Sequence, residues 1–254
     1  MCSEIIAEEE LKCHDEAIKF AFGDIEHESS LTSWTKYASK CAILAPTNEV
    51  VNKVNASCLE KLPGDSVLLP SISSTVDNND AVNYPTEYIE SLEAPGIPPH
   101  NLKLKKGAVV ILLRNLNIEG GLCNGTRLII DEIINNRIIK AIIASGEHQG
   151  DIVLIPRIQS KPPDYTPYGF EWKRLQFPLR LAFSMTINKA QGQTLKHVSV
   201  WLETPCFSHG QLYVSSSRVG SKQQLRFFIS KKEGYPRYTT RNVVYEELLE
   251  DSDY

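Results

Sequence analysis

The spacing of hydrophobic positions predicts an α/β segment that starts near residue 41. The run CAILA at 41–45 is short and wholly apolar, which is typical of a strand buried in a parallel sheet. Pro46 and Thr47 then open a predicted helix. Its hydrophobic residues recur at helical spacing and would form one buried face: Val50, Val51, Val54, Cys58 and Leu62.

A different pattern, of short β runs between turn residues, covers residues 102–158. The runs AVVILLR, TRLIIDEII, RIIKAIIA and DIVLIPRI are separated by sequences such as NGT, NN and SGEHQG. Several short strands at this spacing predict a small β-barrel. Residues 63–99 are rich in Pro, Ser, Asn and Asp and predict loops, with YPTEYIESL as one or two helical turns.

After a proline-rich bridge the α/β pattern returns. A strand at 179–183 is expected to lead into the turn SMTINKAQG, and HVSVWLE and LRFFIS predict further strands. HGQLYVSSSRV between them predicts a helix, with Ser208 and Gln211 as its capping box. Because strands and helices occur on both sides of the β runs, the expected fold is one α/β domain with an inserted β module.

Composition divides the chain into five expected parts. Residues 1–40 are an acidic connecting segment, and 41–100 begin the α/β domain and contain a loop-rich excursion. The inserted barrel is expected at 101–160 and the rest of the α/β domain at 161–230. Residues 231–254 form an acidic tail.

Charge is distributed unevenly along these parts. Residues 1–100 contain 6 Lys/Arg and 17 Asp/Glu, whereas residues 101–240 contain 20 and 9. A basic body favours a polyanionic partner, although an ordinary solvated surface explains the same count. No apolar run approaches the roughly 18 residues of a membrane span. We therefore expect no membrane partner, and the acidic start at 1–10 makes secretion unexpected.

The sequence predicts no metal site. The six cysteines are far apart and form no CxxC pair, which favours isolated reduced thiols in a cytosolic or nuclear protein. LIIDEI at 128–133 imitates a metal-binding carboxylate after an apolar strand. Asp131 and Glu132 are instead expected to end a strand in a hairpin.

The turn at 184–195 carries candidate phosphate ligands. Thr186, Asn188 and Lys189 offer a hydroxyl, an amide and a cation at a predicted helix start, which suits phosphate oxygens. Gln191, Gly192 and Gln193 place a flexible backbone amide between two carboxamides. An ordinary polar loop would explain the same residues if they stood alone.

The later helix brings a candidate catalytic cation. Arg218 is expected at its end, pointing outward into a cleft, behind three small serines at 215–217. Together with the turn at 184–195, it favours an arginine acting on a transferred phosphoryl group over a merely solvated arginine. No GxxxxGK[ST] phosphate loop occurs in these 254 residues.

Several segments in the same order resemble the C-terminal half of the Pif-type DNA helicases of superfamily one, in particular the branch found in Helitron transposons. They include AILAPTNEVVNKVN, GIPPHNLKLKKGAVVILL, FPLRLAFSMTINKAQGQTL and FSHGQLYVSSSRV, within residues 41–230. The resemblance implies a second RecA-like motor domain interrupted by a small Src-homology-type β-barrel. It also implies ATP-driven, 5′-to-3′ movement on single-stranded DNA.

By position in the family's motifs, the resemblance assigns roles to single residues. Thr47 and Asn48 would face the DNA backbone, and Thr186, Asn188 and Lys189 would hold DNA phosphates. The implied nucleotide-binding residues are Gln191, Gly192, Gln193, Gln211 and Tyr213, and Arg218 matches the arginine finger.

The motif around Arg218 departs from the family pattern. VSSSR stands where VALSR is usual, so Ser215 and Ser216 are expected to remove apolar packing behind the arginine. Asn52 stands where an acidic residue is usual. The cofactor implied for the complete enzyme is ATP with Mg²⁺, whose ligands would lie in a first motor domain.

The hypothesis is therefore the C-terminal portion of an ATP-dependent DNA helicase, inactive as an ATPase by itself. Its expected partners are single-stranded DNA and a first motor domain, supplied in cis or in trans, in the nucleus or alternatively the mitochondrion. One alternative is a stand-alone module that binds single-stranded nucleic acid, left by a truncated gene or transposon copy. Another is a structural or interaction fragment without DNA affinity.

Overall fold

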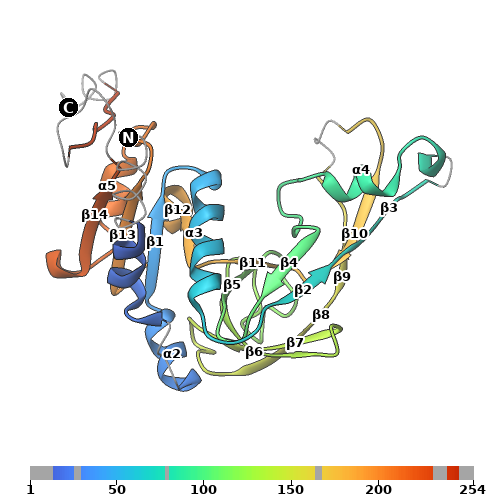
Figure 1. The fold of residues 1–254 in the computed structure, drawn as a ribbon, viewed down its shortest axis with the longest axis horizontal. Helices are drawn as coiled ribbons and strands as arrows, with labels where there is room; N and C mark the ends of the chain where they lie inside the picture. Colours follow the sequence, from blue (N-terminus) through green and yellow to red (C-terminus); the bar gives the residue numbers. More distant parts are fainter. Residues whose placement is uncertain (1–13, 26–29, 78–79, 164–167, 231–238, 246–254) are drawn as a thin grey trace, which may run out of the picture. The chain divides into compact units, whose positions relative to one another are not determined.

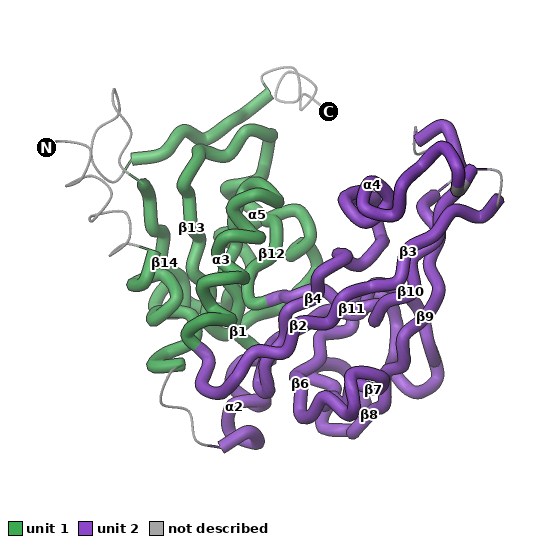
Figure 2. Tube along the Cα trace, turned by 45° about the vertical axis from the view of Figure 1, so that its right-hand side comes forward, with its two compact units in different colours: residues 1–29, 40–61, 183–254 green, residues 30–39, 62–182 purple. Residues whose placement is uncertain are grey.

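The computed structural model describes residues 14–25, 30–77, 80–163, 168–230 and 239–245 of the chain (Figure 1). The chain forms two compact units, which Figure 2 shows in separate colours. Unit 1 consists of residues 1–29, 40–61 and 183–254, and unit 2 of residues 30–39 and 62–182. No helix among the described residues is both long and apolar enough to cross a membrane.

Unit 1 is built on a four-stranded parallel sheet with the order β12-β1-β13-β14 (Figure 1). The strands are β1 (Cys41–Ala45), β12 (Ser184–Thr186), β13 (His197–Leu202) and β14 (Leu225–Ile229). All five residues of β1 are buried, as expected for a central strand covered on both faces. Because the strands are parallel, their carboxyl ends lie at the same edge of the sheet.

Different elements cover the two faces of this sheet. Ala42 and Leu44 of β1 belong to a cluster with Val198 and Val200 of β13, against which Leu212 of α5 (Gln211–Ser216) packs. On the opposite face, Ser199 Oγ donates a hydrogen bond to Ala17 O at 2.6 Å.

Residues 14–22 are helical, within the segment that the sequence predicts to be a connection. The apolar residues Ala17, Ile18, Ala21 and Phe22 are buried. This part of the expected connecting segment therefore belongs to the core of unit 1.

The helix α3 (Asn48–Lys61) follows β1 directly and confirms the predicted βα unit. The Thr47 hydroxyl accepts a hydrogen bond from Val50 N at 3.5 Å, which satisfies one backbone donor at the helix start. Asn55 is 3% exposed and fixes α3 to the edge strand β12. Its Nδ2 donates to Ser184 O at 3.2 Å, and its Oδ1 accepts from Ser184 N at 2.8 Å.

Unit 2 consists mainly of antiparallel strands. They form a five-stranded sheet of order β11-β5-β6-β7-β8, a three-stranded sheet β3-β10-β9 and a pair β2-β4. The elements are α2 (Leu31–Ala38), β2 (Val67–Pro70), β3 (Ile72–Thr75), η2 (Asp80–Val82), α4 (Thr86–Ser91), β4 (Asn101–Leu104), β5 (Val109–Leu112), β6 (Arg127–Ile134), β7 (Ile138–Ile143), β8 (Ile152–Pro156), β9 (Ile158–Ser160), β10 (Trp172–Gln176) and β11 (Leu179–Leu181).

The four predicted β runs correspond to β5, β6, β7 and β8. The NN turn between β6 and β7 is a tight hairpin, because Asn135 and Asn136 both have positive φ, 48° and 55°. Within the described residues, the end strands β8 and β11 do not pair with each other. The closed barrel therefore stays a prediction.

Two sequence-based expectations differ from the structure. The stretch expected to be loop contains the strands β2 and β3, whose partners β4 and β10 lie far along the chain. The expected strand at 179–183 is shorter, and the expected turn after it begins as a strand: β11 at 179–181 pairs antiparallel with β5 in unit 2, whereas β12 at 184–186 pairs parallel with β1 in unit 1. The chain passes between the two units at 29/30, 39/40, 61/62 and 182/183, whereas the sequence predicts domain boundaries at 100/101 and 160/161.

We predict that Asn55→Ala destabilises unit 1 by about 2–4 kcal/mol, because both backbone groups of Ser184 lose their partner. Urea denaturation followed by circular dichroism measures the change in the free energy of unfolding. Asn52→Ala, at an exposed position of the same helix, is the matched control. Equal stability of the two variants would contradict the prediction.

Candidate nucleic-acid and nucleotide site

The carboxyl edge of the parallel sheet brings two of the predicted DNA-binding segments together. Thr186 ends β12 and is paired in register with Ala45, the last residue of β1. Thr47 follows two residues after Ala45, at the start of α3. Thr47 and Thr186 are half-buried and Asn48 is exposed, so this edge carries accessible hydroxyl and amide groups.

The turn after β12 is a single 3-10 turn, η3 (Ile187–Ala190), instead of the expected start of an α-helix. Ile187 and Ala190 are fully buried and anchor it to the sheet, while Asn188 and Lys189 are exposed. Gly192 has a φ of +81°, a conformation that favours glycine. The burial of the first and last residues of η3 therefore fixes a turn that presents the two polar side chains between them outward.

Gln191 and Gln193 continue this turn. Gln191 is exposed and Gln193 is half-buried. Gln193 N donates to Ala190 O at 3.0 Å, and Gln193 Nε2 donates to Lys189 O at 3.4 Å. The carboxamide of Gln193 thus reinforces the turn that carries Lys189.

The helix α5 starts later than the sequence predicts. Gly210, with a φ of 74°, precedes its first residue, and Ser208 does not cap it. One half of the expected capping box is present, because Gln211 Oε1 accepts hydrogen bonds from Phe207 N at 3.1 Å and Ser208 N at 3.4 Å. Gln211 is 2% exposed, and its Nε2 lies 3.4 Å from Asn188 Oδ1. Gln211 therefore joins the loop before α5 to the predicted phosphate-binding turn.

Arg218 does not point freely outward as the sequence predicts. Its Nε donates to Val214 O at 2.9 Å, and one terminal nitrogen is 3.4 Å from the carbonyl oxygens of both Ala190 and Gln193. The other terminal nitrogen donates to Ser217 Oγ at 2.7 Å. The guanidinium thus rests on the backbone of the η3 turn, and both ends of the predicted site are in direct contact.

The serines before Arg218 play a smaller part than expected. Ser215 is buried with its hydroxyl bonded to Leu212 O at 2.7 Å, so it is a satisfied polar group. Ser216 is exposed and bonds the same carbonyl at 2.8 Å. A leucine at Ser216 would gain little burial, so the expected loss of packing does not arise there. Tyr213 is 76% exposed, and its side chain is not among the hydrogen-bond partners described for Arg218.

Asp131 lies within β6, not at the end of a strand as expected. A register shift between Ile130 and Glu132 marks a β-bulge at this position. Its carboxylate contacts Lys140 Nζ at 2.8 Å and Lys106 Nζ at 3.4 Å. The hydrogen bond from Lys140 lowers the pKa of Asp131, and the same contact raises the pKa of Lys140.

The cysteines and acidic groups give no metal site in the described part of the chain. No group of three or more His, Cys, Asp or Glu side chains there is placed to hold an ion. Cys41, Cys58, Cys123 and Cys206 are free thiols, and Cys2 and Cys13 lie outside the described residues. Burial raises the pKa of Cys58, which keeps this thiol protonated and unreactive.

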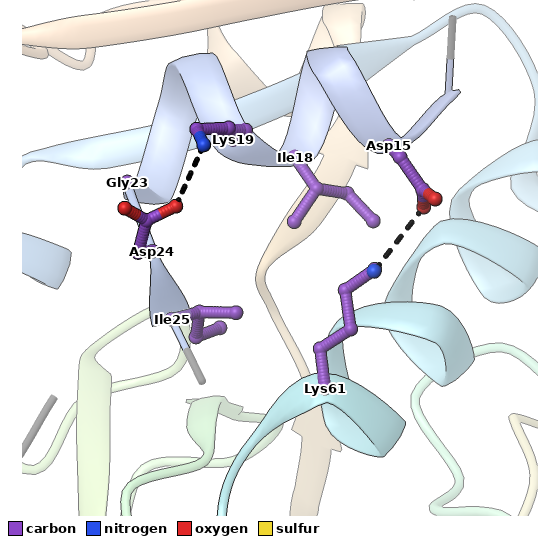
Figure 3. A pocket seen from close by; sticks show the side chains of 7 residues that line it. All are labelled: Asp15, Ile18, Lys19, Gly23, Asp24, Ile25 and Lys61. Atoms are coloured by element: carbon purple, nitrogen blue, oxygen red, sulfur yellow. Dashed lines mark ion pairs between the residues drawn. The ribbon is translucent and has the colours of Figure 1, made fainter. Parts of the chain in front are cut away.

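Unit 1 also contains a pocket of about 240 Å³ that none of the predicted site residues lines. Figure 3 shows two ion pairs beside it, Lys19 with Asp24 at 2.9 Å and Lys61 with Asp15 at 3.3 Å. Each charge at the pocket thus has a partner of opposite sign. The pocket is therefore separate from the candidate site.

Asn55 supports the site and was missed from the sequence. Its signal is a polar residue at helical spacing on the buried face of α3, between Val51 and Cys58. Such a residue must find hydrogen-bond partners, and here these are the backbone groups of Ser184.

Known proteins similar to this chain include ATP-dependent DNA helicases. A family model described as "DNA helicase Pif1, 2B domain" matches residues 87–133, from α4 to most of β6. An ATP-dependent DNA helicase PIF1 from Danio rerio is 30% identical over 178 residues, and one from Rattus norvegicus is 32% identical over 182. These matches cover 69% and 68% of the chain but 25% of each relative. The chain thus spans about a quarter of the length of these relatives.

Solved structures show the same fold. The crystal structure of a Pif1 helicase from Candida albicans is 25% identical with a TM-score of 0.57, over 75% of this chain and 47% of that one. A Bacteroides Pif1 structure, described as bound to ssDNA, has a TM-score of 0.60 at 20% identity, over 82% and 44%. These neighbours confirm an α/β fold with a parallel sheet.

The ion pairs of Asp131 give a pH-dependent stability that Asp131→Asn should remove. Because the folded-state pKa is lowered, the contribution is present above the ordinary value of 3.8 and is lost as the pH falls through the lower folded-state value. Urea denaturation at neutral pH should show the variant less stable, with the difference disappearing in strong acid. Glu119→Gln, an exposed loop carboxylate, is the control. If the difference in stability between the variant and the unchanged chain does not depend on pH, the prediction is wrong.

Proposed function

Because the chain is homologous to the C-terminal part of Pif-type DNA helicases, we propose that it forms the second motor domain and the neighbouring β domain of an ATP-dependent DNA helicase. In this role unit 1 is the second RecA-like domain, and the five-stranded sheet of unit 2 is the small Src-homology-type barrel. The complete enzyme would move 5′-to-3′ on single-stranded DNA.

The observation that carries this proposal is the arrangement of the carboxyl edge of the parallel sheet. Thr47 and Thr186 lie at the ends of the paired strands β1 and β12, and Asn188 and Lys189 follow on the exposed side of η3. Hydroxyl, amide and ammonium groups on such an edge suit the phosphates of a DNA backbone. The Bacteroides structure described as bound to ssDNA supports this choice of ligand.

Arg218 is the proposed arginine finger. A guanidinium is permanently charged, and its N–H groups can bind the oxygens of a phosphoryl group in the transition state of its transfer. Its contacts with the carbonyls of Ala190 and Gln193 place it beside Gln191 and Gly192, the proposed nucleotide-side residues. A related Pif1 structure described as a complex with ADP-AlF3 and ssDNA supports a nucleotide as the second ligand.

The residues present fit one side of an ATP site. The Arg218 guanidinium offers donors for phosphate oxygens and Gln211 holds Asn188 of the adjoining turn, whereas the phosphate loop GxxxxGK[ST] does not occur in the 254 residues. Bound ATP would supply the phosphoryl group for hydrolysis. We propose that a first motor domain, in cis or in trans, supplies the phosphate loop and the ligands of Mg²⁺. A nuclear location, with the mitochondrion as the alternative, stays a proposal.

A second candidate function is a stand-alone module that binds single-stranded nucleic acid, because the exposed amide and ammonium groups of Asn188 and Lys189 suit a nucleic-acid backbone without any nucleotide. Both candidate functions use the same DNA-binding edge of the sheet. They differ in whether bound nucleotide changes the affinity for DNA. A salt-sensitive affinity that nucleotide and a first motor domain leave unchanged would favour the stand-alone module.

We predict that the chain binds a labelled oligothymidine with an affinity that falls as salt rises, because binding releases counterions from phosphates. Lys189→Gln should lower the slope of log affinity against log salt by about 0.7, the value for one contact to a single strand. Fluorescence anisotropy over a salt series measures it. Lys196→Gln, exposed at the amino end of β13, should leave the slope unchanged. Equal slopes for both variants would place the DNA elsewhere.

We predict no appreciable ATPase for the chain alone and a DNA-stimulated ATPase once a first motor domain is supplied. In that complete enzyme Arg218→Ala should lower kcat by about 10³-fold or more, and Arg218→Lys should not restore it. A coupled phosphate-release assay measures both. Arg137→Ala, at the exposed β6–β7 hairpin, is the control. If the isolated chain shows an ATPase activity that depends on DNA and on Arg218, the proposal that a first motor domain is required is wrong.

A further inference from the structure

We propose that the imidazole of His209 is a stacking site for a nucleobase of bound single-stranded DNA, and that Tyr245 occupies this site in the free chain. The inference rests on the proposed DNA-binding function and identifies a contact beyond the phosphate ligands. In this arrangement the segment 239–245 competes with DNA for one aromatic site.

Two contacts hold Tyr245 on His209. The two rings are stacked, with centroids 5.3 Å apart and an interplanar angle of 27°. The backbone N–H of Tyr245 also donates a hydrogen bond to His209 Nδ1 at 3.0 Å. Both residues are nevertheless exposed, with Tyr245 47% exposed. A planar ring thus binds His209 at an exposed surface, which is also how a splayed base would bind.

The segment 239–245 passes the same edge of the sheet that carries the proposed DNA ligands. Thr239 and Thr240 line a small hollow with Leu202 and Ile229, the last residues of β13 and β14. Because all four strands are parallel, this is the carboxyl edge, where β12 ends at Thr186. DNA bound along that edge and the segment 239–245 would therefore meet.

The loop containing His209 has the properties of a base-binding surface. Phe207 in this loop is 61% exposed, although its burial would be favourable. Gln211 bonds the backbone of Phe207 and also lies 3.4 Å from Asn188, so one side chain links this loop to the phosphate-binding turn. Proteins that bind single strands combine cations along the backbone with aromatic rings on which bases stack. The two parts of that combination adjoin here.

Charge favours exchange over simultaneous binding. Residues 246–254, which directly follow Tyr245, contain five acidic residues and no basic residue. A DNA strand at this edge would bring phosphates towards the start of that acidic stretch, and like charges repel. Release of Tyr245 on DNA binding vacates the stacking site on His209.

The test measures oligothymidine affinity of the full chain by fluorescence anisotropy at one low salt concentration. Tyr245→Ala should tighten binding by about threefold or more, because the site no longer needs to be vacated. His209→Ala should weaken binding by about fivefold, the lower end of the range for losing one base stack. In the His209→Ala background, Tyr245→Ala should lose most of its effect.

Matched controls are available in unit 2. Tyr88→Ala removes a tyrosine that is 45% exposed and stacked on Tyr84, and His148→Ala removes a half-buried histidine that contacts Asp151. Both should bind like the unchanged chain. Amide hydrogen exchange gives an independent measure, because the N–H of Tyr245 should lose protection when oligonucleotide is added.

The outcomes separate this inference from the proposed function. If the unchanged chain binds the oligonucleotide while Tyr245→Ala and His209→Ala both bind it with unaltered affinity, the inference is overturned and the DNA-binding function stands. Retained protection of the Tyr245 amide in the bound state would overturn it as well. If no form of the chain binds at low salt, the proposed function itself is overturned.

Discussion

The parallel pairing of β1 with β12 and β13 is the constraint on which the candidate site depends. β12 is only three residues long and lies at the edge of its sheet, so strand pairing alone holds it weakly. Asn55 of α3 adds two hydrogen bonds between its side chain and the backbone of Ser184. The position of Thr186, and of the turn that follows it, is thus set jointly by β1 and by α3. A single buried carboxamide connects the helix after Thr47 to the strand before Asn188.

Basic side chains hold unit 2 together at the points where the chain enters or leaves it. Arg127, 3% exposed, donates to the carbonyls of Ala38, Ser39 and Ala182, each at the end of a unit 2 segment. Lys105 Nζ donates to Leu62 O at 2.7 Å, at the start of the next segment. Cations also suit the carbonyls at the end of a helix such as α2. The β domain therefore fixes its own chain ends before the chain continues into unit 1.

Patterns that depend on local burial were readable from the sequence. The apolar run of β1, the helical spacing of α3 and the NN hairpin each follow from the residues themselves. The strands β2 and β3 were missed because their partners are distant and because Pro70 and several serines imitate a loop. The strand β12 inside the expected turn was missed for a similar reason, since it follows β11 after two residues but pairs in a different sheet. Long-range pairing, which local propensity does not encode, decided these cases.

The contact between Arg218 and the turn at 186–193 was also not predictable from the sequence. Sequence motifs identified Arg218 and the 186–193 turn separately, but the contact between them depends on backbone carbonyls, which every residue has. Arg218 reaches Ala190 O and Gln193 O only because η3 folds back after β12. A guanidinium that satisfies three backbone carbonyls loses those bonds if it turns to a phosphate, so ligand contacts must replace them. Any shift of the η3 turn by a DNA strand changes two of these acceptors. The turn that would grip DNA is therefore also the surface that positions the arginine, which gives a physical route for coupling the two ligands.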